Sequence, residues 1–156
     1  MIRGFQEIEF AKPADGARLQ WGPALEAGLI AGAILLVVPR GSPWSQFTFF
    51  SPIVLGRNLA GVGNFPLPLI WIVHLVLALV YGVIVSALVS KLTNWRAILV
   101  GGLVGLVLYF VNLGLVALCF PNLIRAEGLV AFTHVVFGLL AAGAYRGLLH
   151  RRFRGE

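Results

Sequence analysis

Three long, predominantly apolar segments constrain the fold of this chain more than any other feature. They cover residues 67–90, 97–120 and 128–149. About 20 predominantly apolar residues in an α-helix span the hydrocarbon core of a bilayer. Inside lipid, the backbone must satisfy its own hydrogen bonds, which favours helices. We therefore predict an all-α integral membrane protein in which each of these segments is a transmembrane helix.

The overall composition agrees with a membrane protein. Hydrophobic residues make up 59% of the chain and charged residues only 12%, whereas about 25% of a soluble protein is charged. The net charge of +6 comes from basic residues at the ends of apolar segments, which is a topology signal rather than a nucleic-acid surface. The single cysteine, Cys119, excludes an internal disulfide framework and a cysteine-rich metal site. The expected partner is the lipid bilayer, with no nucleic acid.

A fourth transmembrane helix is predicted over residues 17–38, although its uninterrupted apolar part, 27–38, is only twelve residues long. The helix therefore extends toward the N-terminus, where Arg18 can reach the headgroup level with its long side chain. The preceding arm, 1–16, carries Glu7, Glu9 and Asp15, whereas a secretory signal peptide starts with a short basic stretch. We expect this first helix to be retained as a membrane anchor.

The distribution of Lys and Arg predicts the orientation. Nine of these residues lie in the N-terminal arm with Arg18, in the loop 91–96 and around the C-terminal tail 150–156. Only three, Arg40, Arg57 and Arg125, lie in the segments 39–66 and 121–127. Because Lys and Arg are enriched in cytoplasmic loops, both termini are expected in the cytoplasm of a multi-pass protein of the cell membrane.

The segment 39–66 is too apolar for a free loop and too interrupted by proline to span the bilayer. We expect it to lie in the non-cytoplasmic interface as a loop or short helix, because aromatic rings favour the headgroup level. Its predicted anchors are Trp44, Phe47, Phe49 and Phe50. A partner-binding surface and a lid over a site are the alternatives for this segment.

A repeated pattern of small residues and histidines predicts internal duplication. The first helix of each predicted hairpin has glycines four residues apart, and the second has a histidine followed by small residues at the same spacing. The two copies are Gly28, Gly32, His74, Ala78 and Gly82, and then Gly101, Gly105, His134, Gly138 and Ala142. Small residues let helix backbones approach closely. The chain is therefore predicted to form two parallel hairpin repeats around a pseudo-two-fold axis along the membrane normal.

His74 and His134 are candidate cofactor ligands, because ionisable side chains inside membrane spans are rare. Two opposed imidazoles can hold a haem b, and the same pair can bind copper or zinc. A simpler alternative is that each histidine donates a hydrogen bond to a carbonyl, or to a hydroxyl such as that of Tyr81, on a neighbouring helix. Asn112 and Ser86 are the other notable polar side chains within the spans, and packing is their simplest role.

The sequence leaves three functional hypotheses. The sequence has no nucleophile elbow, H-E-x-x-H, phosphate-loop or CxxC motif, so we expect no enzyme activity. Asp and Glu are missing from the middle of all four segments, which argues against a carboxylate relay for proton-driven transport. The favoured hypothesis is a non-catalytic accessory or scaffold subunit that binds other membrane subunits or further copies of itself. The alternatives are a bis-histidine haem protein of membrane electron transfer and a small transporter or channel.

Overall fold

The computed structural model describes residues 18–37, 67–119 and 128–154, and this part of the chain is entirely helical apart from short turns. Its four helices are α1 (Trp21–Val37), α4 (Leu67–Val89), α5 (Asn94–Cys119) and α6 (Gly128–Arg154). The all-α prediction is confirmed for the described residues. The predicted arm 1–16, the loop 121–127 and the segment 39–66, with Trp44, Phe47, Phe49 and Phe50, lie outside them.

Two helices extend beyond the apolar segments from which they were predicted. Helix α5 begins at Asn94, three residues before the predicted start, and the Thr93 carbonyl accepts a hydrogen bond from the Ala97 N–H at 2.7 Å. Helix α6 continues to Arg154, five residues beyond the predicted end. Hydropathy marks the part of a helix suited to hydrocarbon, whereas backbone hydrogen bonds continue a helix into polar surroundings. Both helices are therefore longer than the apolar segments within them.

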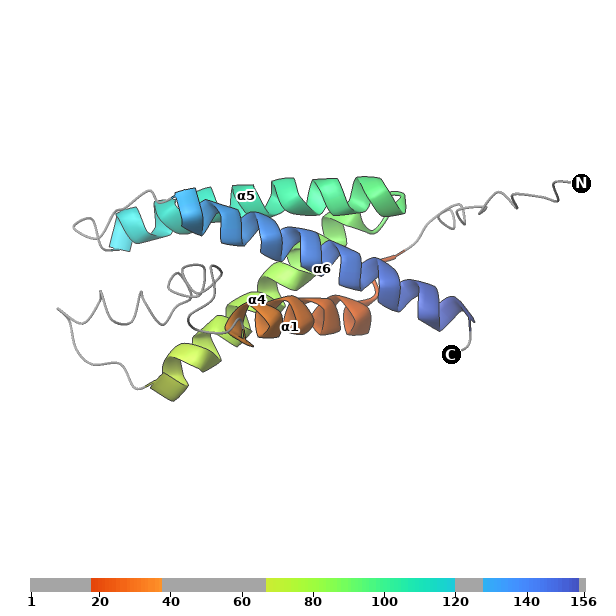
Figure 1. Cartoon of the computed structure of the whole chain (residues 1–156), viewed down its shortest axis with the longest axis horizontal. Coiled ribbons are helices and arrows are strands. Elements are labelled where there is room, and N and C mark those ends of the chain that lie inside the picture. Colours follow the sequence, from red (N-terminus) through yellow and green to blue (C-terminus); the bar gives the residue numbers. More distant parts are fainter. Residues whose placement is uncertain (1–17, 38–66, 120–127, 155–156) are drawn as a thin grey trace, which may run out of the picture.

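Helices α1 and α5 run in one direction along the long axis of the molecule, and α4 and α6 run in the opposite direction (Figure 1). The short turn between α4 and α5 lies at the same end as the start of α1 and the end of α6 (Figure 1). Each pair of successive helices, α1 with α4 and α5 with α6, is therefore an antiparallel hairpin, and the two hairpins point the same way.

Helices α4 and α6 cross between α1 and α5 (Figure 1) and each contacts all three other helices. The most completely buried side chains are small, which allows this close packing. They include Ala24, Ala27, Ala31, Ala97, Ala141 and Ala142. Tyr145 of α6 is the largest fully buried side chain, and its hydroxyl accepts a hydrogen bond from the Gln20 N–H at 3.3 Å. This tyrosine thereby ties the last turns of α6 to the start of α1.

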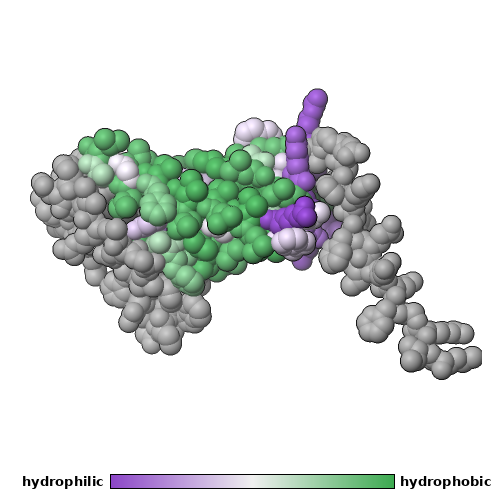
Figure 2. Space-filling view, turned by 90° about the horizontal axis from the view of Figure 1, so that it is seen from above, coloured by the Kyte–Doolittle hydropathy of each residue, from purple (hydrophilic) through white to green (hydrophobic). Residues whose placement is uncertain are grey.

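The outer surface between the two ends of the bundle is apolar. Helices α4, α5 and α6 are each long and apolar enough to cross a membrane, whereas α1, with 17 residues, is shorter. Figure 2 shows the apolar surface along the bundle and hydrophilic side chains gathered at one end. Exposed Leu, Ile and Val side chains in such numbers suit contact with lipid rather than water.

Candidate functional site

The first hairpin, α1 with α4, is packed through glycines that leave no room for a side chain. A Cβ placed on Gly28 would lie 2.5 Å from the Ala78 carbonyl oxygen and 3.0 Å from the Gly82 Cα. A Cβ placed on Gly32 would lie 2.5 Å from the Ala78 Cβ. The backbones of α1 and α4 are therefore in direct contact, as small residues four positions apart allow.

The second hairpin, α5 with α6, has contacts of the same kind. A Cβ placed on Gly101 would lie 2.5 Å from both the Gly138 carbonyl oxygen and the Ala142 Cβ. A Cβ placed on Gly105 would overlap the His134 carbonyl oxygen, and one on Gly138 would overlap that of Gly101. All the small residues singled out in the sequence therefore lie at the interface inside their own hairpin.

His74 is tied to the other helix of its own hairpin. Its Nε2 lies 3.1 Å from the Gly32 carbonyl oxygen of α1. A carbonyl oxygen only accepts, so the ring must donate from Nε2. The half-buried imidazole thereby joins α4 to α1 beside the contact between Gly32 and Ala78.

His134 belongs to a chain of hydrogen bonds across three helices. Its Nε2 lies 2.9 Å from the amide nitrogen Nδ2 of Asn112 on α5, and its Nδ1 lies 2.9 Å from the Val130 carbonyl oxygen of α6. The other side of the Asn112 amide, Oδ1, accepts a hydrogen bond from the Tyr81 hydroxyl of α4. This polar chain, Tyr81–Asn112–His134, thus connects the first hairpin to the second.

The donors and acceptors of the polar chain fix its proton positions. An amide nitrogen only donates, so the Nε2 of His134 accepts from Asn112. The Val130 carbonyl only accepts, so the Nδ1 of His134 carries the proton. The imidazole is therefore neutral, with both ring nitrogens in use. The two polar atoms of the Asn112 side chain are likewise both occupied.

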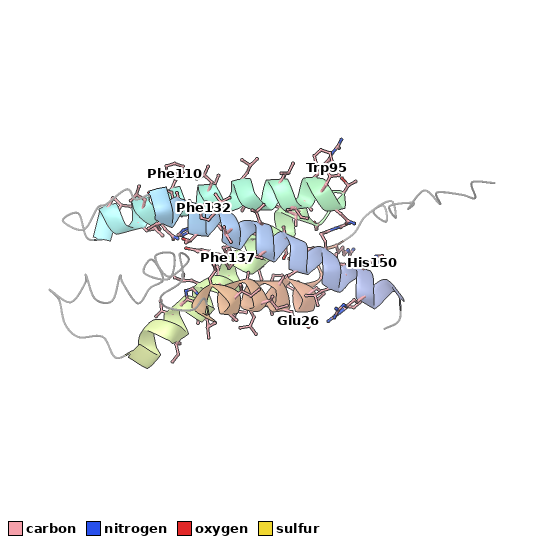
Figure 3. The ribbon with its side chains drawn as sticks, viewed as in Figure 1. Glu26, Trp95, Phe110, Phe132, Phe137 and His150 are labelled. Atoms are coloured by element: carbon pink, nitrogen blue, oxygen red, sulfur yellow. The ribbon has the colours of Figure 1, made fainter. Side chains whose placement is uncertain are left out.

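Two aromatic rings pack against the polar chain. Tyr109 meets the His134 ring edge to face at a centroid distance of 5.7 Å, and Phe137 meets the Tyr81 ring in the same way at 6.3 Å. Phe137 is nearly buried at the centre of the bundle, whereas Phe110 projects from the outer face of α5 (Figure 3). Such surroundings strengthen hydrogen bonds, because little water competes for the donors and acceptors.

The two candidate haem ligands differ in the ring nitrogens that they leave available. A bis-histidine haem requires an available nitrogen on each ring. In the described structure, His134 uses both ring nitrogens, Nε2 with Asn112 and Nδ1 with the Val130 carbonyl. The hydrogen bond of His74 with the Gly32 carbonyl uses Nε2 alone. Among the described residues, no three His, Cys, Asp or Glu side chains gather in the manner of a metal site.

Ser86, the other polar side chain singled out in the sequence, is fully buried, and its Oγ has no hydrogen-bond partner within the described chain.

A second group of polar contacts lies at the hydrophilic end of the bundle. The Arg146 Nε donates to the Asn94 Oδ1 at 3.0 Å, which joins α6 to the start of α5. The Arg152 guanidinium lies 3.5 Å from the Glu26 carboxylate, which joins α6 to α1. Glu26, Trp95 and His150 all lie toward this end (Figure 3). Exposed ion pairs of this kind contribute little to stability.

Sequence reasoning singled out the members of the polar chain but not their connection. Asn112 lies eight residues before residue 120, the predicted outer end of its segment, and His134 lies six residues after residue 128, the predicted outer start of the next segment. The sequence therefore indicates that Asn112 and His134 lie at similar heights on neighbouring helices. Tyr81 lies deeper, but a tyrosine side chain in a helix points back toward the helix N-terminus. That direction brings its hydroxyl toward Asn112.

Comparison with known proteins found no match for this chain among family models, curated proteins or solved structures.

Proposed function

We propose that this chain is an integral membrane protein in which all four helices cross the bilayer as two copies of one hairpin. The contacts of the two hairpins support this, because they recur at corresponding positions. Gly28 meets Ala78 and Gly82, and Gly101 meets Gly138 and Ala142. The common direction of the two hairpins in Figure 1 fits a pseudo-two-fold axis along the membrane normal.

Helix α1 is the shortest of the four proposed membrane helices. Its 17 residues correspond to about 25 Å of helix, against a hydrocarbon core of about 30 Å. Local thinning of the bilayer around α1 accommodates such a difference at modest cost. The contacts of α1 with α4 and α6 hold it within the bundle.

The proposed orientation places the hydrophilic end of the bundle in the cytoplasm. Every described Lys and Arg lies toward this end, and lysines and arginines favour cytoplasmic flanks. A reporter enzyme that works only in the cytoplasm should therefore be active when fused after Glu156. A second reporter that works only outside the cytoplasm serves as the control, and its activity at the same position would contradict the orientation.

The proposed role is a non-catalytic accessory or scaffold subunit of a larger membrane complex. One observation carries this proposal: His74, Tyr81, Asn112 and His134 direct their hydrogen bonds to one another or to the backbone of the bundle. Side chains engaged in this way stabilise helix packing and leave little chemistry for a substrate, a transported ion or a haem. The long apolar outer face of α5 then provides a surface for a neighbouring subunit.

Photocrosslinking from the outer face of α5 tests the accessory role. Leu103 and Val107 of α5 are 63% and 60% exposed, and Ile30 on the opposite helix α1 is the control position. A photoactivatable residue at 103 or at 107 should give the same defined protein adduct in native membranes, and none should form from position 30. The mass of the adduct distinguishes a second copy of this chain from another subunit.

Two outcomes would contradict the accessory role. One is a set of lipid adducts alone at all three positions. The other is a haem-type difference spectrum, reduced minus oxidised, from the purified protein that disappears in His74→Ala and in His134→Ala. The second result would support the electron-transfer alternative instead.

A further inference from the structure

The hydrophilic end of the bundle carries a group of exposed positive charges. We call this group the basic end, and it consists of Arg18, Lys91, Arg96, Arg151 and Arg152. Glu26 is the only acidic side chain among the described residues. The charges of the basic end are therefore largely uncompensated within the described chain, and they sit where the apolar surface stops (Figure 2).

Contacts within the protein hold part of the basic end in place. The Arg152 guanidinium rests on the first turn of α1, where its nearest nitrogen lies 3.1 Å from the position that a Cβ of Gly22 would take. The same guanidinium pairs with Glu26 at 3.5 Å. The glycine thus leaves space for the arginine, and the guanidinium lies against the start of α1.

Two exposed tryptophans lie at the starts of the helices that begin at this end. Trp21 is the first residue of α1 and Trp95 the second residue of α5, and their side chains are 65% and 62% exposed. The Arg96 guanidinium carbon lies 5.3 Å from the centroid of the Trp95 ring. Exposed indole rings favour the headgroup level of a bilayer, which places the cations of the basic end among the lipid phosphates.

We propose that the basic end is a binding surface for the headgroups of anionic phospholipids. The proposal rests on the membrane insertion argued above, and it adds a preference among lipids that insertion alone does not require. Arginine forms strong, paired hydrogen bonds with phosphate oxygens, and cations near an anionic membrane surface are attracted to it. An excess of positive charge at this end meets its complement in anionic lipid rather than in zwitterionic lipid.

Quenching of tryptophan fluorescence by brominated lipid tests the preference in the full-length protein. Replacing Trp44 and Trp71 with Phe leaves Trp21 and Trp95, both at the basic end, as the only reporters. The protein is reconstituted in phosphatidylcholine vesicles with a fixed fraction of brominated phosphatidylglycerol or brominated phosphatidylcholine. We expect the anionic brominated lipid to quench severalfold more effectively, and 1 M salt to reduce the difference, because it screens exposed charges beyond about 3 Å.

In the protein with Trp44 and Trp71 replaced by Phe, two further substitutions should change the preference for the anionic lipid in opposite directions. Arg151→Gln removes one exposed cation and should weaken the preference for the anionic lipid by up to about fivefold. Glu26→Gln removes the acidic partner of Arg152 and should strengthen the preference. An unchanged elution volume in detergent shows that each variant is folded.

The possible outcomes separate this proposal from the proposed function. Equal quenching by the two brominated lipids, or no response to either substitution, overturns the anionic-lipid surface and leaves membrane insertion intact. Absence of quenching by both lipids overturns membrane insertion and, with it, the lipid preference.

Discussion

The Gly138→Ala variant is expected to lose about 1–3 kcal/mol of unfolding free energy, the usual cost of inserting extra volume into a tightly packed interface. A Cβ at this position would overlap the Gly101 carbonyl oxygen and lie 3.1 Å from the Gly105 backbone nitrogen. These are backbone atoms and cannot rotate away as a side chain can. Helices α5 and α6 must therefore separate, which weakens the contacts along the whole hairpin.

Two other glycines of α6 provide a matched control. A Cβ placed on Gly143 or on Gly147 would have no neighbour within 4 Å. Alanine should be tolerated at either position, or should stabilise by up to about 1 kcal/mol through its higher helix propensity. Unfolding of the purified protein in mixed micelles, titrated with a denaturing detergent, measures all three variants. Equal stability of the three would refute the packing described for α5 and α6.

Asn112→Leu is the second substitution with a large expected effect, a loss of about 1–3 kcal/mol of unfolding free energy. The change keeps a side chain of similar size but removes the hydrogen bonds to Tyr81 and to His134. Hydrogen bonds between membrane helices contribute on average about 0.6 kcal/mol each. The remaining loss arises because the Tyr81 hydroxyl and the His134 Nε2 are left without their partner in apolar surroundings.

Asn94→Leu is the control for the loss of an asparagine, because Asn94 bonds Arg146 at the exposed end of the bundle. Its effect should stay below about 1 kcal/mol. A double-mutant cycle of Tyr81→Phe with Asn112→Leu isolates the bond between the hairpins, and we expect a coupling of about 0.6–1.7 kcal/mol. A coupling of zero would show that Tyr81 and Asn112 do not stabilise each other.

Much of the architecture follows from the sequence because its physical causes are local. The lengths of the apolar segments and the period of the helix determine where helices form, as the segments at 67–90, 97–120 and 128–149 illustrate. The helix ends differ from the predicted boundaries in both directions. Helices α5 and α6 are longer, because polar residues such as Asn94 and Arg151 continue a helix whose apolar part has already ended, whereas α1 begins only at Trp21, inside its predicted range of 17–38.

The sequence indicated the individual polar residues of the candidate site but not which hydrogen bonds connect them. His74, His134 and Asn112 stand out in the sequence because polar side chains are uncommon in membrane spans. Their particular hydrogen-bond partners cannot be identified in the same way, because the atoms that each side chain can reach depend on how the neighbouring helices cross. His74 and His134 occupy equivalent positions of the proposed repeat, yet the Nε2 of His74 donates to a backbone carbonyl, whereas the Nε2 of His134 accepts from a side-chain amide.

The sequence by itself determined that the chain forms apolar helices with faces of small residues, because the spacing of residues in one helix fixes which of them share a face. Only the tertiary structure decided which of those faces are covered. Gly28 with Gly32 and Gly143 with Gly147 have the same spacing, yet the first pair touches α4 and the second faces open space. Residue spacing within one helix carries no information about where a neighbouring helix crosses, and that crossing determines which small residues become a packing interface.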